Sequence, residues 1–156
     1  MTVFIPPLQA ALWLALQQAA AGLGGRRRPH PLAAAAGAGL VASAVGTGAV
    51  TLRLFVARGT TWHPWDPERA SSLVTDGPNR WTRNPMYVAL AAGLAGTGLL
   101  SGRPWTALAS LGLVATLTPQ VRREEAALAS VFGGKWHAYA ARTPRWLGAR
   151  GVPPVA

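Results

Sequence analysis

The sequence of 156 residues predicts an all-α integral membrane bundle of about four transmembrane helices, followed by a polar C-terminal helix. Half of the residues are apolar and only 13% are charged, whereas soluble domains carry about 25% charged residues. The apolar residues are also gathered into blocks separated by short segments rich in Gly, Pro and Arg, which are typical of turns. These observations argue against an ordinary soluble domain.

The charge balance indicates a membrane partner rather than a nucleic acid. A net charge of +10 suits nucleic-acid binding in a soluble protein. Here the basic residues flank apolar segments, where Lys and Arg set the topology and contact anionic lipid head groups. The absence of cysteine excludes disulfides, thiolate metal sites and a Cys nucleophile, and no cluster of metal ligands is visible in the sequence.

Residues 1–56 are expected to form two N-terminal transmembrane helices. The apolar run from Val3 to Leu23 would span ~30 Å as a helix, the thickness of the hydrocarbon core. No basic segment precedes this run and no clear cleavage site follows it, so we expect a retained helix. The second run, Leu32 to Val56, is rich in Gly and Ser, which allow membrane helices to approach closely.

Residues 57–147 are expected to form one core that contains an interfacial loop, a helix hairpin and a C-terminal helix. The loop, 57–84, carries three Trp and three Pro residues, which favour a membrane interface and exclude a long helix. Two short apolar helices are predicted at 86–100 and 105–118. A polar helix at 119–142, broken at Gly133-Gly134, should follow, and 148–156 are expected to be a flexible tail.

The distribution of Lys and Arg predicts the orientation of this bundle. With four crossings, the loop after the second helix and the C-terminal region lie on one side, together with Arg53, Arg58, Arg69, Arg80, Arg83, Arg122, Arg123, Lys135, Arg142, Arg145 and Arg150. The other side holds Arg26, Arg27, Arg28 and Arg103. The excess places the first side in the cytoplasm, although the three arginines of the short first loop argue the other way.

Two polar segments should meet at that side, because the predicted hairpin returns the chain to the same face. The first segment ends in Arg83-Asn84-Pro85-Met86-Tyr87, and the second begins at Arg122 and contains Glu124 and Glu125. Adjacent residues on a helix point ~100° apart, so we expect one of the two glutamates to face a site and the other to form an ion pair. Arg122 and Glu125 are spaced to pair. Solvated charges at the helix ends are the simpler alternative.

These segments resemble two motifs of the isoprenylcysteine carboxyl methyltransferase and phospholipid methyltransferase superfamily. The first segment is similar to its R-H/N-P-x-Y motif, with Asn84 where many members have His. The second is similar to its E-E-x-x-L-x-x-x-F-G-x-x-Y-x-x-Y signature, including Leu128, Phe132 and Tyr139, with Trp136 where an aromatic Tyr is common. The resemblance covers roughly residues 57–147.

The resemblance implies a methyltransferase that uses S-adenosylmethionine and a pocket on the cytoplasmic face. The expected cofactor-binding residues are Gly77, Arg83, Asn84, Pro85, Tyr87 and Glu124. The expected catalytic residues, which would orient or polarise the acceptor, are Arg122, Glu125 and Arg145. A carboxylate acceptor needs no base, whereas an amine or hydroxyl acceptor needs a proton removed, by Glu125 or His137.

Several alternatives remain open at this point. The chain is expected to methylate a lipophilic small-molecule or lipid acceptor, as isoprenylcysteine carboxyl methyltransferases do. A phospholipid amine N-methyltransferase or a catalytically silent membrane scaffold would carry the same apolar pattern. The Arg- and Ala-rich composition favours a bacterial inner membrane, which argues against a prenylated protein as acceptor. The oligomeric state is not predicted.

Overall fold

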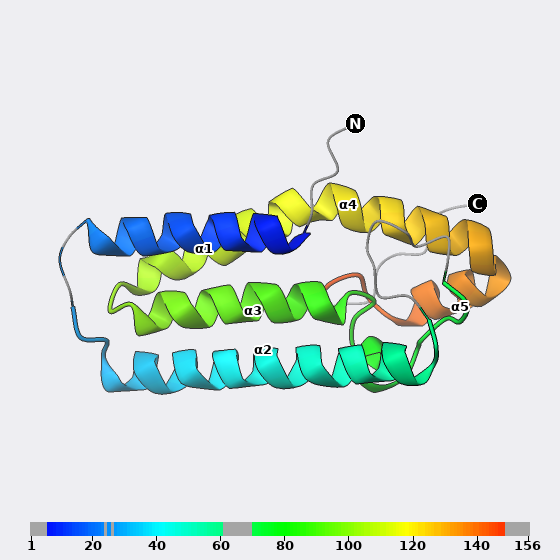
Figure 1. Cartoon of the computed structure of the whole chain (residues 1–156), viewed down its shortest axis with the longest axis horizontal. Helices are drawn as coiled ribbons and strands as arrows, with labels where there is room; N and C mark the ends of the chain where they lie inside the picture. The colour runs from blue at the N-terminus through cyan, green and yellow to red at the C-terminus, as the bar shows by residue number, and fades with distance from the viewer. Residues whose placement is uncertain (1–5, 24, 26, 61–69, 149–156) are drawn as a thin grey trace.

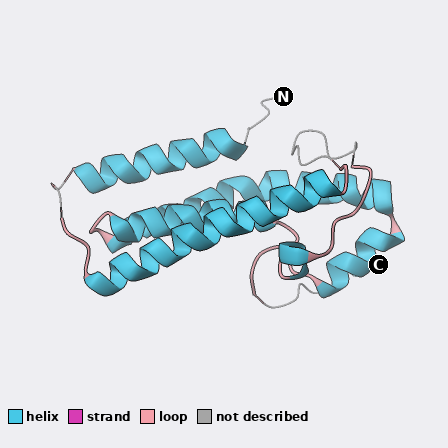
Figure 2. Ribbon diagram, turned by 60° about the horizontal axis from the view of Figure 1, so that its bottom comes forward, coloured by secondary structure: helices cyan, strands magenta, loops and turns pink. Residues whose placement is uncertain are grey.

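The computed structural model describes residues 6–23, 25, 27–60 and 70–148, and in these ranges it contains helices and loops but no strand (Figure 2). The five α-helices are α1 (Pro6–Gly22), α2 (Pro31–Ala57), α3 (Pro85–Leu100), α4 (Ala109–Phe132) and α5 (Gly134–Arg142). Two 3-10 helices connect them, namely η2 (Gly77–Arg80) and η3 (Pro104–Leu108). The all-α prediction is therefore confirmed for the described residues. Residues 1–5, 61–69 and 149–156, which include parts of the predicted first span, interfacial loop and tail, lie outside them.

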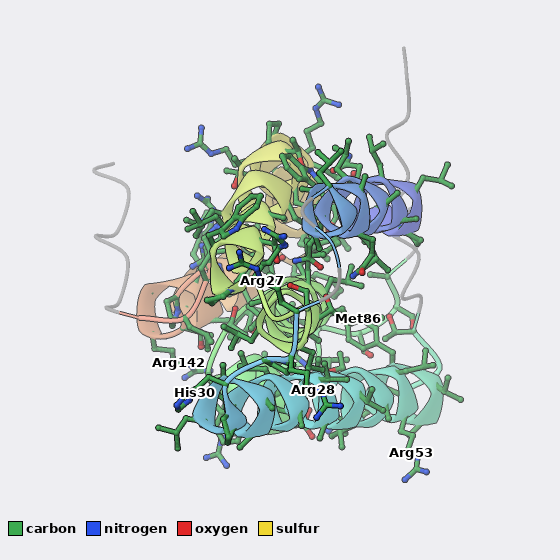
Figure 3. All side chains as sticks on the ribbon, turned by 90° about the vertical axis from the view of Figure 1, so that its left-hand side faces the viewer. Arg27, Arg28, His30, Arg53, Met86 and Arg142 are labelled. Atoms are coloured by element: carbon green, nitrogen blue, oxygen red, sulfur yellow. The ribbon has the colours of Figure 1, made fainter. Side chains whose placement is uncertain are left out.

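Helix α3 lies at the centre of the bundle. Seen end-on, it is placed between α2 on one side and α1 and α4 on the other (Figure 3). The contact between α2 and α3 is close because two glycines meet there: a Cβ atom at Gly37 would lie 2.8 Å from the Gly96 carbonyl oxygen. The small residues of the second apolar run thus act in helix packing, as is usual in membrane proteins.

Helix α1 is attached to α3, η3 and α4 by two side chains. The buried Gln17 amide donates to the carbonyl oxygens of Leu94 at 2.7 Å and Thr106 at 3.0 Å. It also accepts a hydrogen bond from the Thr97 hydroxyl at 2.8 Å. Trp13 packs against Gly112 and its ring N–H donates to a threonine hydroxyl of α4. These contacts hold α1 against the bundle, although large apolar side chains on its outer face are exposed.

One predicted boundary is wrong. The sequence predicts that the apolar hairpin ends at Thr118 and that a separate polar helix begins at Pro119, but α4 continues through Pro119 to Phe132. A proline removes one i→i−4 hydrogen bond, and membrane helices tolerate this loss when nearby side chains bond the backbone. Here the Thr118 hydroxyl donates to the Val114 carbonyl at 2.7 Å, next to the Ala115 carbonyl that has lost its helical donor. The predicted break at Gly133 is confirmed, since Gly133 has a φ of +49° and ends the helix.

The outer surface of the bundle is apolar. Helix α2 is long and apolar enough to cross a membrane, and Leu32, Val45 and Val56 on it are 76%, 68% and 67% exposed. Large apolar side chains that face outward need a nonpolar surrounding, which water does not provide. Helix α3 is also apolar but shorter, with 16 residues. The structure therefore supports a membrane protein and, within the described residues, contains one helix that is long and apolar enough to span a membrane by itself.

The polar elements gather at one end of the bundle. Figure 1 shows the end of α2, η2, the start of α3, the end of α4 and all of α5 at its right-hand side. At the opposite end, the backbone of Arg27 lies against Gly102, so the two short turns touch. The hairpin of α3 and α4 thus returns the second motif to the first, as the sequence predicts.

Candidate active site

Glu125 lies at the centre of the polar end and is only 8% exposed. Its two carboxylate oxygens accept hydrogen bonds from Arg83, at 3.0 Å from Nε and 3.2 Å from a terminal nitrogen. Arg145 binds the same carboxylate at 2.7 Å and 3.0 Å. Glu125 therefore forms the ion pair that the sequence predicts for one of the two glutamates, with Arg83 and Arg145 as its partners rather than Arg122.

Arg83 also holds α5 in place. Its third nitrogen donates to the carbonyl oxygens of Ala140 and Thr143, both at 2.9 Å, which are left without helical partners at the end of α5. Its guanidinium carbon lies 5.8 Å from the centroid of the Trp136 ring, within the range of a cation–π contact. Arg83 thus joins the start of α3 to α4 and α5.

Asn84 adds a second connection between the same elements. It is buried and stands at the N-cap of α3, and Pro85 occupies the first helical position, where its missing N–H is not needed. The Asn84 amide donates to Glu125 at 3.3 Å and to the Arg145 carbonyl at 3.0 Å. The side-chain amide of Asn84 thus donates to a carboxylate and to a carbonyl at the same time. Both contacts are made with Asn, rather than His, at this position.

The arginines set the protonation of Glu125. Burial acts to raise its pKa, but the hydrogen bonds from Arg145 and Arg83 and the charges of both arginines outweigh burial, so that the pKa of Glu125 is lowered. Glu125 is therefore a carboxylate at neutral pH. A carboxylate that accepts bonds from two arginines and one amide is a poor proton acceptor, because protonation would break those contacts.

Glu124 has different surroundings. It accepts hydrogen bonds from the Tyr87 hydroxyl at 2.7 Å and from the Gln120 amide at 3.0 Å, and no cation contacts it among the described residues. Burial raises its pKa, the bonds from Tyr87 and Gln120 lower it, and the charge of Glu125 raises it. The result is a pKa of about 7.

A cavity of about 190 Å³ lies between these elements. Residues of both motifs line it: Arg83, Asn84, Pro85, Met86 and Tyr87 from the start of α3, and Glu124, Glu125 and Leu128 from α4. Its remaining wall comes from α1, α2, η2 and the segment before it, α3 and α5, through Pro6, Pro7, Thr51, Phe55, Ala70, Ser72, Leu73, Val74, Asn79, Leu90, Trp136 and Tyr139. Most of this wall is apolar. In Figure 3, Met86 lies on the side of α3 that faces the gap between α1 and α2.

Three residues expected in the site do not line this cavity. Gly77 begins η2 with a φ of +56° and packs against the Leu54 side chain, where a Cβ atom would collide. Arg145 stands behind Glu125, and its side chain is 33% exposed. Arg122 is exposed on α4 and forms no side-chain hydrogen bond or ion pair with the described residues. The structure thus brings six of the nine expected residues to the cavity and leaves these three outside.

Other cavity residues were missed by the sequence analysis. Tyr139 belongs to the second motif and donates its hydroxyl to the Asn79 carbonyl at 2.7 Å, so the motif itself marked it. The Ser72 hydroxyl is buried and has no partner among the described residues. Neither Ser72 nor the wall residues of α1 and α2, such as Pro7 and Phe55, stand in a motif. Only their position in the bundle places them here.

Comparison with known proteins agrees with this arrangement. The family model described as phospholipid methyltransferase matches residues 32–135, more than half of the chain, from α2 to the start of α5. A search of the curated proteins and a search of the solved structures returned no match. The matched region contains Arg83, Tyr87, Glu124 and Glu125, on which the cavity depends. The chain therefore belongs to the phospholipid methyltransferase family, a family of membrane methyltransferases.

Proposed function

We propose that this protein is an integral membrane methyltransferase that moves a methyl group from S-adenosylmethionine to a lipophilic acceptor. The observation that carries the proposal is the single cavity that both family motifs line, with Arg83 and Tyr87 on α3 and Glu124 on α4. One wall of the cavity carries charged and polar side chains, and the other wall is apolar. A methyl transfer between a polar donor and a lipid needs both walls, because it depends on holding the two reactants close and in line.

The cavity residues fit the proposed cofactor. The buried Ser72 hydroxyl, which has no partner among the described residues, offers a hydrogen bond to a ribose or adenine group. Trp136 and Tyr139, whose ring centroids are 5.7 Å apart, offer aromatic surface. Arg83 keeps one N–H for the cofactor carboxylate, since four of its five N–H groups are in use. When bound, S-adenosylmethionine supplies a methyl group on a positively charged sulfur.

The residues proposed from the sequence divide into two groups. Arg83, Asn84, Pro85, Tyr87 and Glu124 would form the polar wall around the cofactor, as expected. Glu125 and Arg145 would act as positioning residues, because Glu125 holds Arg83 and Asn84 in place and Arg145 holds Glu125. Gly77 would shape η2 behind the cavity. Arg122 has no part in this proposal.

The acceptor would enter from the bilayer. The apolar wall of the cavity includes Pro7 on α1, Phe55 on α2 and Leu90 on α3, and it adjoins the bare outer surface of the bundle. In this proposal α1, α2, the α3 helix and the first half of α4 cross the membrane, which makes four crossings. The polar end, with its excess of Lys and Arg, would face the cytoplasm, where a water-soluble cofactor reaches it.

The proposal is tested by calorimetric binding of S-adenosylhomocysteine to the detergent-purified chain. We expect saturable binding by the wild type. Leu128→Trp fills the cavity and should abolish binding, whereas Val131→Trp, on the exposed face of the same helix, should bind like the wild type. Absence of binding by a wild type whose helix content is intact would refute the cofactor and favour a catalytically silent scaffold. Equal binding by both variants would move the site elsewhere.

A further inference from the structure

A second hollow lies on the outer surface of the bundle, between η2 and the last turns of α2 (Figure 1). This groove has a volume of about 390 Å³ and is open on its outer side. Its lining on α2 comes from Gly46, Thr47 and Val50, and its opposite lining includes Pro78, Arg80 and Trp81. None of the groove residues lines the cavity between the two motifs. The neighbouring Asn79 does line that cavity, and its carbonyl accepts a hydrogen bond from Tyr139 at 2.7 Å. The helix η2 therefore separates the groove from the cavity.

Arg80 gives the groove a positive charge. Its side chain is exposed and forms no hydrogen bond or ion pair with the described residues. The carboxylate of Asp76, which precedes η2, is bonded to Arg58 at 2.6 Å, so its charge is already balanced. Within the described part of the chain, the Arg80 guanidinium is thus available to an anion. Its planar, forked donors match the geometry of a phosphate group.

The α2 side of the groove suits a hydrocarbon chain. Val50 is 45% exposed, and a Cβ atom on Gly46 would have no neighbouring atom within 4 Å. Gly46 therefore leaves a space that the described residues do not fill. It stands 11 residues before the end of α2 at Ala57, which corresponds to ~16 Å along the helix. In a bilayer whose head groups lie at the polar end of the bundle, this depth is inside the hydrocarbon core.

Trp81 marks the level of the head groups. Its side chain is 72% exposed, and exposed tryptophans of membrane proteins gather at the membrane–water interface. Because Trp81 follows Arg80 directly, the positive charge stands at the same level. The groove thus combines a cation and an aromatic ring at head-group depth with an apolar floor further into the bilayer. A phosphate joined to an acyl chain has the same order of groups.

We propose that this groove binds a phospholipid with an anionic head group, whose phosphate contacts Arg80 and whose acyl chain lies along Gly46 and Val50. This lipid is a bound ligand and not the methyl acceptor, since η2 separates it from the cavity. A zwitterionic lipid carries its own ammonium group, which competes with Arg80 for the phosphate, whereas an anionic lipid such as phosphatidylglycerol does not. In the proposed orientation, the polar end also faces the leaflet with the negative surface potential.

The test is native mass spectrometry of the full chain in detergent, titrated separately with phosphatidylglycerol and phosphatidylcholine. We expect one phosphatidylglycerol molecule to bind about fivefold more tightly than phosphatidylcholine, which is the contribution of one arginine near the head groups. Arg80→Gln should lower the affinity for phosphatidylglycerol by about this factor and remove the preference. The matched control is Arg122→Gln, which removes the same charge from an exposed position at the same end and should bind like the wild type.

A second pair of variants tests the apolar half of the groove. Gly46→Leu fills the floor and should weaken the binding of both lipids by about tenfold or more, because acyl CH₂ groups lose their contact surface. Ala49→Leu adds the same side chain on an exposed part of α2 outside the groove and should bind like the wild type. Circular dichroism should show wild-type helix content in both, since a Cβ atom at Gly46 meets open space.

Four results would overturn the proposal. The first is a wild type that binds neither lipid or binds both equally. The second is equal binding by Arg80→Gln and Arg122→Gln, and the third is equal binding by Gly46→Leu and Ala49→Leu. The fourth is a lipid-free dimer that Gly46→Leu dissociates, which would assign the groove to a second copy of the chain.

Discussion

Arg83 and Glu125 stand 42 residues apart in the sequence and form a two-point ion pair that joins the start of α3 to the polar half of α4. Both side chains are about 10% exposed. The pair fixes the distance between the two family motifs. Without it, the arginine and the glutamate would each be a buried charge with fewer partners, so the pair is the first contact to test.

Replacement of Arg83 by Gln should destabilise the protein by about 3–5 kcal/mol, because it leaves a buried carboxylate with one arginine instead of two. Arg83→Lys should also be destabilising, since an ammonium group does not reproduce the two-point contact. The midpoint of thermal unfolding in detergent measures both. The control is Arg58→Gln, which removes an exposed ion pair with Asp76 and should cost ~1 kcal/mol or less. Equal effects of the two Gln variants would contradict this role of Arg83.

Replacement of Gln17 by Leu should weaken the attachment of α1. The change leaves the carbonyl oxygens of Leu94 and Thr106 without the donors that the amide supplies, at a cost of about 1–3 kcal/mol. Gln18→Leu, on the exposed face of the same helix, is the matched control and should be close to neutral. Limited proteolysis and thermal unfolding in detergent both report the difference. Two variants of equal stability would show that α1 is held by its apolar contacts alone.

The contact between α2 and α3 should be intolerant of side chains. Gly37→Ala and Gly96→Ala each place a Cβ atom less than 3 Å from the carbonyl oxygen of the other glycine. The helices must then separate, and we expect a loss of about 1–3 kcal/mol from each change. Gly39→Ala and Gly46→Ala, which meet open space in the chain, should leave the unfolding midpoint unchanged or slightly higher. An unfolding midpoint of Gly96→Ala equal to that of the wild type would mean that α2 and α3 accept a Cβ atom at this contact without loss of stability.

The stability of the protein should depend on pH through Glu124. Its pKa is raised from 4.5 to about 7 on folding, so its protonated form is favoured in the folded state. This contribution is complete below about pH 4.5 and is lost as the pH rises through about 7. The free energy of unfolding of the wild type, measured relative to Glu124→Gln, should therefore fall by on the order of 2–3 kcal/mol over that range. A difference in the free energy of unfolding that stays constant across this range would show that folding does not raise the pKa of Glu124.

The proposed membrane topology can be tested because the chain has no cysteine. Single cysteines at Arg28 and Lys135 would mark the two ends of the bundle, and both positions are exposed. In intact bacterial cells, a membrane-impermeant maleimide should label Arg28→Cys and not Lys135→Cys, and lysis should make both reactive. The reverse pattern would invert the orientation. Labelling of both positions in intact cells would refute an odd number of crossings between them.

The sequence by itself determined the helical class, the membrane setting and the two motifs. Long apolar runs require helices in a bilayer, since backbone groups have no other partners there, and Asn84-Pro85 and Gly133 mark helix ends by local backbone chemistry. These are properties of short segments. They predicted the start of α3 and the break before α5, and they failed at Pro119, where the rest of α4 keeps the helix continuous.

Only the tertiary structure decided which of the two glutamates pairs with the arginines. Glu124 and Glu125 are adjacent and chemically identical, so nothing in the sequence distinguishes them. The helical turn between them directs Glu125 toward Arg83 and Arg145 and leaves Glu124 with Tyr87 and Gln120. For the same reason, Arg122 was expected in the site and lies outside it, while Ser72 and the wall from α1 and α2 could not be foreseen. Contacts across the bundle, which join residues many positions apart, gave these side chains their different surroundings and hence their different charges.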